Sequence, residues 1–455
     1  MGRNDGYEPN WVANLETLLA YNSRLCSAEK LEYRVAFVEW NPPASEPLIA
    51  PRLVEKFPFV RGIIVEPGVH AALCETNDLD VMLNFSYNAA LRTSNADYTL
   101  ITGGDIFFTR AIARRMAQGL RPGVFYRAER VNIRADLPFS EMTPEELELP
   151  EHVTSVDSCT IPPNDVPPYT MASGDFLMLD TGTMRGMRGM DEEIRSARLH
   201  LDSRFCRTAM VVTDSCELLG QILHIEHHNS FRKQGGAKGR PYTWNAGLPY
   251  ANPDSWGLAD FAWLPLGPAL WRIVPRRGTS EAAPIVDLSP QCERHAASIT
   301  AKLQEIRRSQ RPQRPPADVT SAALASCRLG TGAGVQTIPD DRGLRVCTRP
   351  IQWSPAIVLS YEIGEALEND RWYWAVLRLI VSTGSVVVSL APDMPEDYYA
   401  LQSIEPIDIA VPIATKTGQI AIRNAAPDGA SSTFLMQSLN FVSSESRATS
   451  AQLSA

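Results

Sequence analysis

The stretch Ala96 to Thr109, ADYTLITGGDIFFT, decides the fold of the N-terminal part of the chain. It predicts a buried strand over Tyr98–Thr102, a turn made of two glycines, and a second apolar run over Ile106–Phe108. Asp105 stands where the first strand ends. Open α/β sheets bind their ligands at the carboxyl ends of strands, so Asp105 is a candidate ligand of a metal ion. The alternative is a turn aspartate that caps a short helix.

Further strand signals lie on both sides of this stretch and alternate with helical patterns. Tyr33–Trp40 is mostly apolar, as is typical of a parallel strand that is buried on both faces. Phe59–Glu66, Val124–Val131 and Leu218–Glu226 have the same character. Strands that alternate with helices predict an α/β domain. Leu137–Pro168, rich in Pro, Glu and Asp, is interpreted as an irregular excursion over the sheet.

The character of the sequence changes after a proline-rich segment. We predict an α/β domain over 1–275, a helical and Pro-rich linker over 276–320, and a β-domain over 321–455. Regularly spaced short strands predict an antiparallel, jelly-roll-like sandwich. They are Leu344–Thr348, Ala356–Tyr361, Tyr373–Ser382, Ser385–Leu390, Ile407–Ala414, Gln419–Arg423 and Thr433–Phe441.

The sandwich contains tryptophans but no catalytic constellation. Trp353, Trp372 and Trp374 offer flat apolar faces on which a sugar ring can stack. Packing in the sandwich core is the favoured interpretation, since Trp is highly buried on average.

Composition excludes several classes of protein. The 455 residues carry a net charge of -9 and no lysine-rich block, which argues against nucleic-acid binding. The 8 cysteines form no C-x-x-C pair, which argues against a zinc ribbon or a disulfide framework. No apolar stretch approaches the roughly 20 residues that span a bilayer. We expect a cytoplasmic protein, with peripheral membrane association and homo-oligomerisation as further options.

Nine motifs occur in a fixed order between residues 31 and 258. They are VEWNPP, the helix carrying Asn88 and Arg92, LITGGDIFF, FYRAERVNI, ASGDFLML, MRGMDEE, HLDS, LHIEHHNS and NPDSWGL. In this order they resemble GT-A-fold, family 2-like glycosyltransferases. The resemblance implies an α/β nucleotide-diphospho-sugar transferase domain with a mixed sheet. It also implies a nucleotide-diphospho-sugar donor, a glycan acceptor, and Mn²⁺ or Mg²⁺ as cofactor.

The resemblance also implies roles for individual residues. The catalytic acids are Asp202, expected as the general base, together with Asp191 and Glu192 on the acceptor side. The donor nucleotide and its diphosphate are assigned to Glu39, Asn41, Asn88, Arg92 and Asp105. The sugar and acceptor are assigned to Gly174 and Asp175, and further substrate contacts to Arg127, Arg130 and Arg188.

The implied metal site departs from a common pattern. Many such enzymes carry two acids in a D-x-D motif, whereas Gly103 occupies the earlier position here. Asp105 would bind the metal together with His227 and His228, and His224 is a further candidate. Imidazole and carboxylate ligands suit Mn²⁺. Surface positions at a strand end are the alternative for the histidines, and an exposed helix acid is the alternative for Asp202.

Three functions follow from these residues. The first is an inverting, metal-assisted, hexosyltransferase-like enzyme of surface or secreted glycan synthesis. The second is a non-catalytic protein that binds a sugar nucleotide or a glycan, which the missing acid at Gly103 favours. The third, a glycoside hydrolase, needs two carboxylates facing each other across a cleft. The sequence does not supply that pair clearly.

Overall fold

The computed structural model describes most of the chain as two compact units. Unit 1 spans 1–74, 79–236 and 248–308, and unit 2 spans 75–78, 237–247 and 309–455. The described residues are 10–75, 79–161, 164–170, 172–195, 201–226, 243–245, 249–276, 288–309, 319–321, 324–352, 354–364, 373–391, 396–401, 405–413, 415–426 and 429–444.

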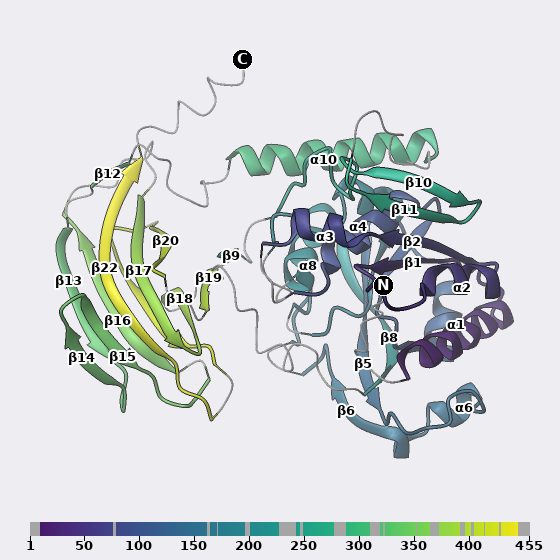
Figure 1. Cartoon of the computed structure of the whole chain (residues 1–455), viewed down its shortest axis with the longest axis horizontal. Coiled ribbons are helices and arrows are strands. Elements are labelled where there is room, and N and C mark those ends of the chain that lie inside the picture. The colour runs from purple at the N-terminus through teal and green to yellow at the C-terminus, as the bar shows by residue number, and fades with distance from the viewer. Residues whose placement is uncertain are drawn as a thin grey trace. The chain divides into compact units, whose positions relative to one another are not determined.

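Unit 1 is built from alternating helices and strands (Figure 1). Its described elements in chain order are α1 (Trp11–Ala28), β1 (Val35–Trp40), α2 (Ile49–Lys56), β2 (Val60–Val65), α3 (Pro67–Leu73), α4 (Leu83–Arg92), β3 (Tyr98–Ile101), β4 (Ile106–Phe108), α5 (Arg110–Ala117), β5 (Val124–Ile133), α6 (Pro144–Leu147), a 3₁₀ turn (Pro150–His152), β6 (Val153–Asp157), β7 (Leu177–Asp180), α7 (Thr181–Gly186), α8 (Leu201–Val212), β8 (Ser215–Ile225), β10 (Ala262–Gly267), β11 (Leu270–Val274) and α10 (Pro290–Ser309).

The first sheet of unit 1 is covered on both faces. Its order is β1-β2-β11-β10, and β1, β2 and β11 are parallel. Val38 and Ile63 pack on one face with residues of α3 and α4. Phe37 and Ile64 pack on the other face with residues of α1 and α2. Because neighbouring strand residues point to opposite faces, this double burial explains the nearly continuous apolar sequence of Tyr33–Trp40.

The second sheet of unit 1 is mixed and has the order β3-β7-β5-β8-β4, with β6 added to β5. β5 and β8 are parallel, and β7 runs antiparallel to both β3 and β5. The carboxyl ends of β3, β5 and β8 therefore meet at one edge, where β7 begins. We call it the strand-end edge. Asp105 lies on this edge, after β3.

Unit 2 is a sandwich of two antiparallel sheets, ordered β14-β15-β22-β17-β20 and β13-β16-β21-β18-β19-β9. Figure 1 shows the long strands β17 and β22 side by side. Both sheets contribute to one apolar core, including Leu359, Leu377 and Phe434. The predicted antiparallel sandwich is thus confirmed. Its described strands are β9 (Thr243–Asn245), β12 (Val319–Ser321), β13 (Leu324–Thr331), β14 (Gln336–Asp340), β15 (Gly343–Cys347), β16 (Pro355–Ile363), β17 (Tyr373–Thr383), β18 (Ser385–Ala391), β19 (Glu396–Leu401), β20 (Ile407–Ile413), β21 (Thr417–Asn424) and β22 (Thr433–Ser444).

The segment predicted as a linker, 276–320, contains a helix that packs with unit 1. In α10, the Thr300 hydroxyl donates to the Gly186 carbonyl at 2.8 Å, and Lys302 Nζ donates to the Val211 carbonyl at 2.6 Å. The compact part of unit 1 consequently reaches residue 308, beyond the boundary predicted at 275.

The excursion predicted over 137–168 is more ordered than expected. It contains α6, which begins with a capping box between Thr143 and Glu146. It also contains β6, which pairs antiparallel with β5 and aligns Asp157 with Arg130. Polar side chains of β6 thereby reach the strand-end edge.

Candidate functional site

Asp105 lies on the strand-end edge with its carboxylate folded back over Gly103. A methyl group at Gly103 would lie 2.3 Å from Asp105 Oδ1, well inside contact distance. A side chain at position 103 would therefore require the Asp105 carboxylate to rotate away from its present place. Asp105 is the acid that remains to face a ligand there.

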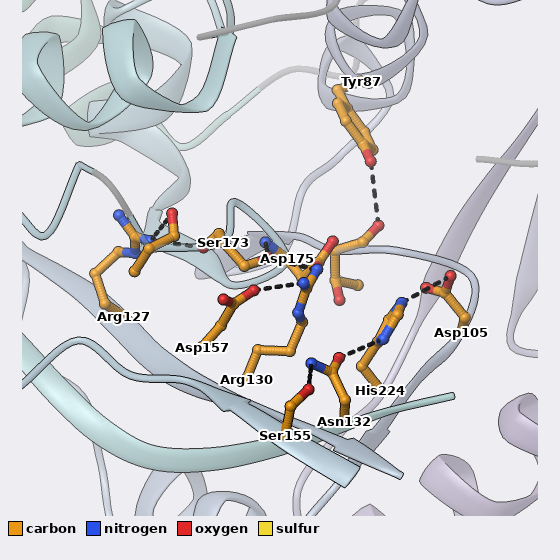
Figure 2. Close-up of polar contacts among 12 residues, drawn as sticks. Tyr87, Asp105, Arg127, Arg130, Asn132, Ser155, Asp157, Ser173, Asp175 and His224 are labelled. Carbon is orange, nitrogen blue, oxygen red and sulfur yellow. Dashed lines mark hydrogen bonds and ion pairs between the residues drawn. The ribbon is translucent and has the colours of Figure 1, made fainter. Parts of the chain in front are cut away.

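His224, near the end of β8, faces Asp105 across the edge (Figure 2). Its Nε2 lies 3.4 Å from Asp105 Oδ2, and its side chain is 11% exposed. The other ring nitrogen, Nδ1, lies 2.8 Å from Asn132 Oδ1, and Asn132 Nδ2 donates to Ser155 Oγ at 2.8 Å. Strands β5, β6 and β8 thus supply one chain of polar contacts that ends at Asp105.

Arg130 of β5 is the cation of the edge. Its guanidinium is ion-paired with Asp157 and lies 2.8 Å from Asp175 Oδ2. It also donates to Ser173 Oγ at 3.2 Å. Burial lowers the pKa of Arg130, but the carboxylates of Asp175, Asp157 and Asp105 outweigh it and raise the pKa overall. The guanidinium is therefore fixed among acids beside Asp105.

Asp202, in the first turn of α8, packs against the loop before β7. A methyl group at Gly174 would lie 2.9 Å from Asp202 Oδ2. Asp202 Oδ1 accepts a 2.8 Å hydrogen bond from the Ser203 backbone N–H. Burial raises the pKa of Asp202; Arg127 opposes the effect and the nearby Asp175 adds to it. A carboxyl group with a raised pKa is a stronger base than an exposed aspartate, which suits proton abstraction.

Asp105 and His224 are the donors that the strand-end edge offers to the predicted Mn²⁺ or Mg²⁺. In the part of the chain that the structure describes, no three His, Cys, Asp or Glu side chains gather as a metal site. Two donors do face each other, Asp105 Oδ2 and His224 Nε2, at 3.4 Å. Ligands about 2.1 Å from one ion lie roughly 3–4 Å apart, and Mg²⁺ usually keeps several waters and substrate phosphates. The pair fits such an ion.

Two donor-site predictions fall on residues at the end of β1. Glu39 is fully buried, and its two carboxylate oxygens accept hydrogen bonds of 2.8–2.9 Å from the backbone N–H groups of Ile49 and Ala50. Burial raises its pKa, against the effect of these bonds. Glu39 therefore caps α2 and does not line a nucleotide pocket. Asn41 adopts a positive φ of 52° and donates to the Asp80 carbonyl at 3.3 Å.

Arg127 also acts inside the protein instead of binding substrate. Its side chain is fully buried, and it donates to the backbone carbonyls of Pro168, Tyr169, Ala172 and Ser173. The shortest of these bonds, to Ser173, is 2.6 Å. Arg127 thereby holds the segment that carries Gly174 and Asp175 to the strand-end edge.

The predicted acceptor acids are held by contacts with other segments of unit 1. Asp191 is fully buried and ion-paired with the buried Arg204 at 2.8 Å. Glu192 is 6% exposed, and its Oε1 accepts hydrogen bonds from Asn88 Nδ2 and the Gly257 N–H at 2.9 and 2.7 Å. Burial raises the pKa of Glu192 to about 7. Both acids therefore bind other parts of unit 1, and their catalytic role stays a prediction.

Asn88, Arg92 and Arg188 lie in the same region as Asp191 and Glu192. Asn88 bonds Met190 through both amide atoms, and Arg92 donates to the Trp256 carbonyl at 2.5 Å. Arg188 is ion-paired with Asp254. The region borders a cavity of about 630 Å³ lined partly by Arg188, Glu192 and Asp254.

Four residues with a predicted role lie outside the described residues, and three residues of the strand-end edge had no predicted role. His227, His228, Trp353 and Trp372 lie outside the described residues, while Trp374 is buried. Sequence reasoning assigned no role to Asn132, Ser155 or Asp157. The run Val153–Asp157, VTSVD, has two β-branched valines around a threonine and a serine, which is a weak strand signal.

Comparisons with known proteins give little similarity. No protein-family model and no curated protein matches the chain. Among solved structures, a family 29 carbohydrate-binding module matches with 12% identity and a TM-score of 0.20, covering 29% of this chain and 92% of that one. CBM29_1 from Piromyces equi matches with 11% identity, a TM-score of 0.20, and 28% and 89% coverage. TmCBM61 in complex with a galactotriose matches with 11% identity, a TM-score of 0.19, and 26% and 90% coverage.

These identities and TM-scores leave the function to be inferred from the site itself. Among the described residues, none of the helices is both long enough and apolar enough to span a membrane.

Proposed function

We propose that unit 1 is a glycosyltransferase that binds a nucleotide-diphospho-sugar at the strand-end edge and transfers the sugar to an acceptor hydroxyl. One observation carries the proposal: Asp105, Arg130, Asp175 and His224 converge at one edge of a mixed α/β sheet. Ligands of open α/β sheets bind at this kind of edge. The order of motifs that resembles GT-A glycosyltransferases supports the same function.

The charges of the edge suit a diphosphate donor. Asp105 and His224 would hold Mn²⁺ or Mg²⁺, which as a Lewis acid offsets the charge that develops on the leaving diphosphate. Arg130 is a fixed cation beside them, and its planar fork matches phosphate oxygens. Binding a diphosphate would exchange part of the contact between Arg130 and Asp175 for a contact with phosphate.

Asp202 is the residue we assign as general base. The transfer breaks the bond between the sugar and the diphosphate and forms one to the acceptor oxygen, and Asp202 accepts the proton of that hydroxyl. Its burial and its position against Gly174 support this role. A general base contributes about 10²–10⁴ to the rate. Asp191 and Glu192 are not needed for this step.

The proposal is tested by incubating the full chain with UDP-, GDP- and CDP-sugars and Mn²⁺ and measuring released nucleoside diphosphate, with water as the acceptor. We expect release from one donor and loss of release in Asp202→Asn. Binding should persist in that variant, because its Asp105 and Arg130 are unchanged. Release at the wild-type rate in Asp202→Asn would contradict the assignment.

A second function, binding of a sugar nucleotide or glycan without transfer, is favoured by one observation. Gly103 stands where a D-x-D motif would carry its first acid, so that Asp105 is the single acid of the motif after β3. This function predicts tight donor binding with no release of nucleoside diphosphate from any donor. The same assay therefore separates the two functions.

A further inference from the structure

We propose that the hairpin of β10 and β11 rests its tip on a lipid bilayer and so attaches unit 1 to a membrane surface. The run Phe261–Trp271, FAWLPLGPALW, contains no charged residue, and its only polar side-chain groups are the indole N–H groups of Trp263 and Trp271. A run of this kind normally packs inside a protein or against another apolar phase. The protein itself buries only part of it.

The base of the hairpin packs in unit 1. Trp263 is 1% exposed, and its indole N–H donates to a backbone carbonyl of the same unit at 3.0 Å. Trp271 and Leu270 pack against the apolar cores on the two faces of the sheet. The Gly62 N–H donates to the Ala269 carbonyl at 2.8 Å, which ties the turn to β2. The hairpin is therefore held in place before it meets any partner.

The hairpin tip, residues 264–268, faces solvent instead. Leu264 is 40% exposed and Leu266 is 47% exposed, and Pro265 and Pro268 are exposed as well. These apolar side chains are close together in the chain and have no acid among them. The exposed apolar residues between 149 and 166 differ in this respect, because acids are interspersed with them. Burying those acids at a lipid surface would be costly, which leaves the hairpin tip as the better anchor.

Two properties of the tip favour a lipid surface over a protein partner. β10 is the outer strand of its sheet (Figure 1), but Pro265 within it and Pro268 after it have no N–H to offer to an added strand. A stable protein–protein interface covers about 800 Å² on each partner, far more than the side chains of the tip expose. A bilayer requires no such area, because a short apolar segment can enter the boundary between headgroups and acyl chains.

The charges around the hairpin indicate how it binds. Asp260 and Arg276 stand on either side of it, and Arg272 of β11 is ion-paired with Glu66 at 3.3 Å. The hairpin therefore presents no excess of positive charge, and attraction to anionic lipid contributes little. Apolar contact drives the association, and salt does not screen apolar contact. We expect binding to neutral lipid at high salt as well as at low salt.

The test is co-sedimentation of the full chain with phosphatidylcholine vesicles at low and high salt, without metal or nucleotide. We expect the wild type to bind under both conditions. The double variant Leu264→Ser/Leu266→Ser should bind about tenfold more weakly or worse, because it loses the apolar contact of two half-exposed leucines. Leu329→Ser is the matched control and should bind like the wild type, since Leu329 is a 45% exposed leucine of unit 2.

Several results would overturn the proposal. They are no binding of the wild type to the vesicles, equal binding by the wild type and the double variant, and binding that disappears at high salt. Sedimentation velocity without vesicles tests a second copy as the partner: a wild-type dimer that the double variant dissociates would also overturn it. If the double variant does not fold, Leu266→Ser alone replaces it. Because no sugar donor is present, failure of the proposed transfer leaves this result intact.

Discussion

The backbone of Gly174 lies directly against the carboxyl group of Asp202. A methyl group at Gly174 would be 2.5 Å from Asp202 Cβ and 2.9 Å from Oδ2, distances that real side chains do not tolerate. The first turn of α8 and the loop before β7 can therefore approach this closely only with glycine at position 174. The contact fixes where the proposed general base stands.

Gly174→Ala should displace Asp202 and lower turnover by at least about 10²-fold, the contribution of a general base. Overpacking should also cost about 1–3 kcal/mol in the free energy of unfolding. Turnover is measured with the nucleotide-release assay, and stability by urea unfolding. Gly267→Ala is the control, since a methyl group there meets nothing within 4 Å. Full turnover in Gly174→Ala would show that the contact does not position the base.

The acid side of the pH profile should report Asp202. Burial raises the pKa of Asp202, and the base must be deprotonated to accept a proton. Turnover should therefore begin to fall, as pH decreases, at a higher pH than an ordinary aspartate would give. The residual turnover of Asp202→Asn should lack this limb when rates are measured across the acid range. An identical acid limb in both proteins would assign it to another group.

Arg127 and Arg130 should behave differently, although both lie on β5 with only two residues between them. Arg127→Met leaves the carbonyls of the 168–173 segment without their donor, at about 1–3 kcal/mol for each buried group. We expect a loss of several kcal/mol in urea unfolding. Arg130→Met, at a partly exposed position, should instead weaken binding of the nucleoside diphosphate with a smaller loss of stability. The reverse pattern would exchange the two roles.

Glu192 should make the protein less stable as pH rises toward neutrality. Burial raises its pKa to about 7 from the ordinary 4.5, a difference worth roughly 3 kcal/mol. The folded chain holds this proton more tightly than the unfolded chain. Its contribution is fully present below about pH 4.5 and is lost as pH rises through about 7.

Glu192→Gln keeps an acceptor for Asn88 and Gly257 but cannot titrate. Urea unfolding at pH 5 and pH 8 should show a smaller loss of stability in the variant than in the wild type. Equal losses in the two proteins would mean that Glu192 is ionised in the folded chain at both pH values.

The sequence predicted the elements but not which polar side chains face inward. Asp105 and Asp175 were identified because each stands beside a strong strand signal, and the structure brings both to one edge. Glu39 also stands at a strand end, yet its carboxylate points at the N–H groups of α2. A sequence pattern gives the position of a residue along a strand and does not reveal which neighbouring helix end its side chain meets.

Partners that come from distant segments were equally hidden. Ser155 and Asp157 reach the edge through pairing of β6 with β5, across a segment whose Pro, Glu and Asp content indicated an irregular path. The ion pair of Asp191 with Arg204 likewise joins residues that lie 13 positions apart in the sequence. Long-range pairing of this kind is decided by tertiary packing, which local propensity does not encode.

The most direct test of the strand-end edge as a donor site is calorimetric titration of UDP, GDP and CDP, with and without Mn²⁺. The comparison is between the wild type, Asp105→Asn and Asp136→Asn, the last an exposed acid of the same unit paired with Arg134. We predict Mn²⁺-dependent binding of one nucleotide, weakened at least about tenfold by Asp105→Asn, or about 1.4 kcal/mol, and unchanged by Asp136→Asn. Absence of binding by every nucleotide, or equal affinity in the wild type and Asp105→Asn, would contradict the assignment of this edge.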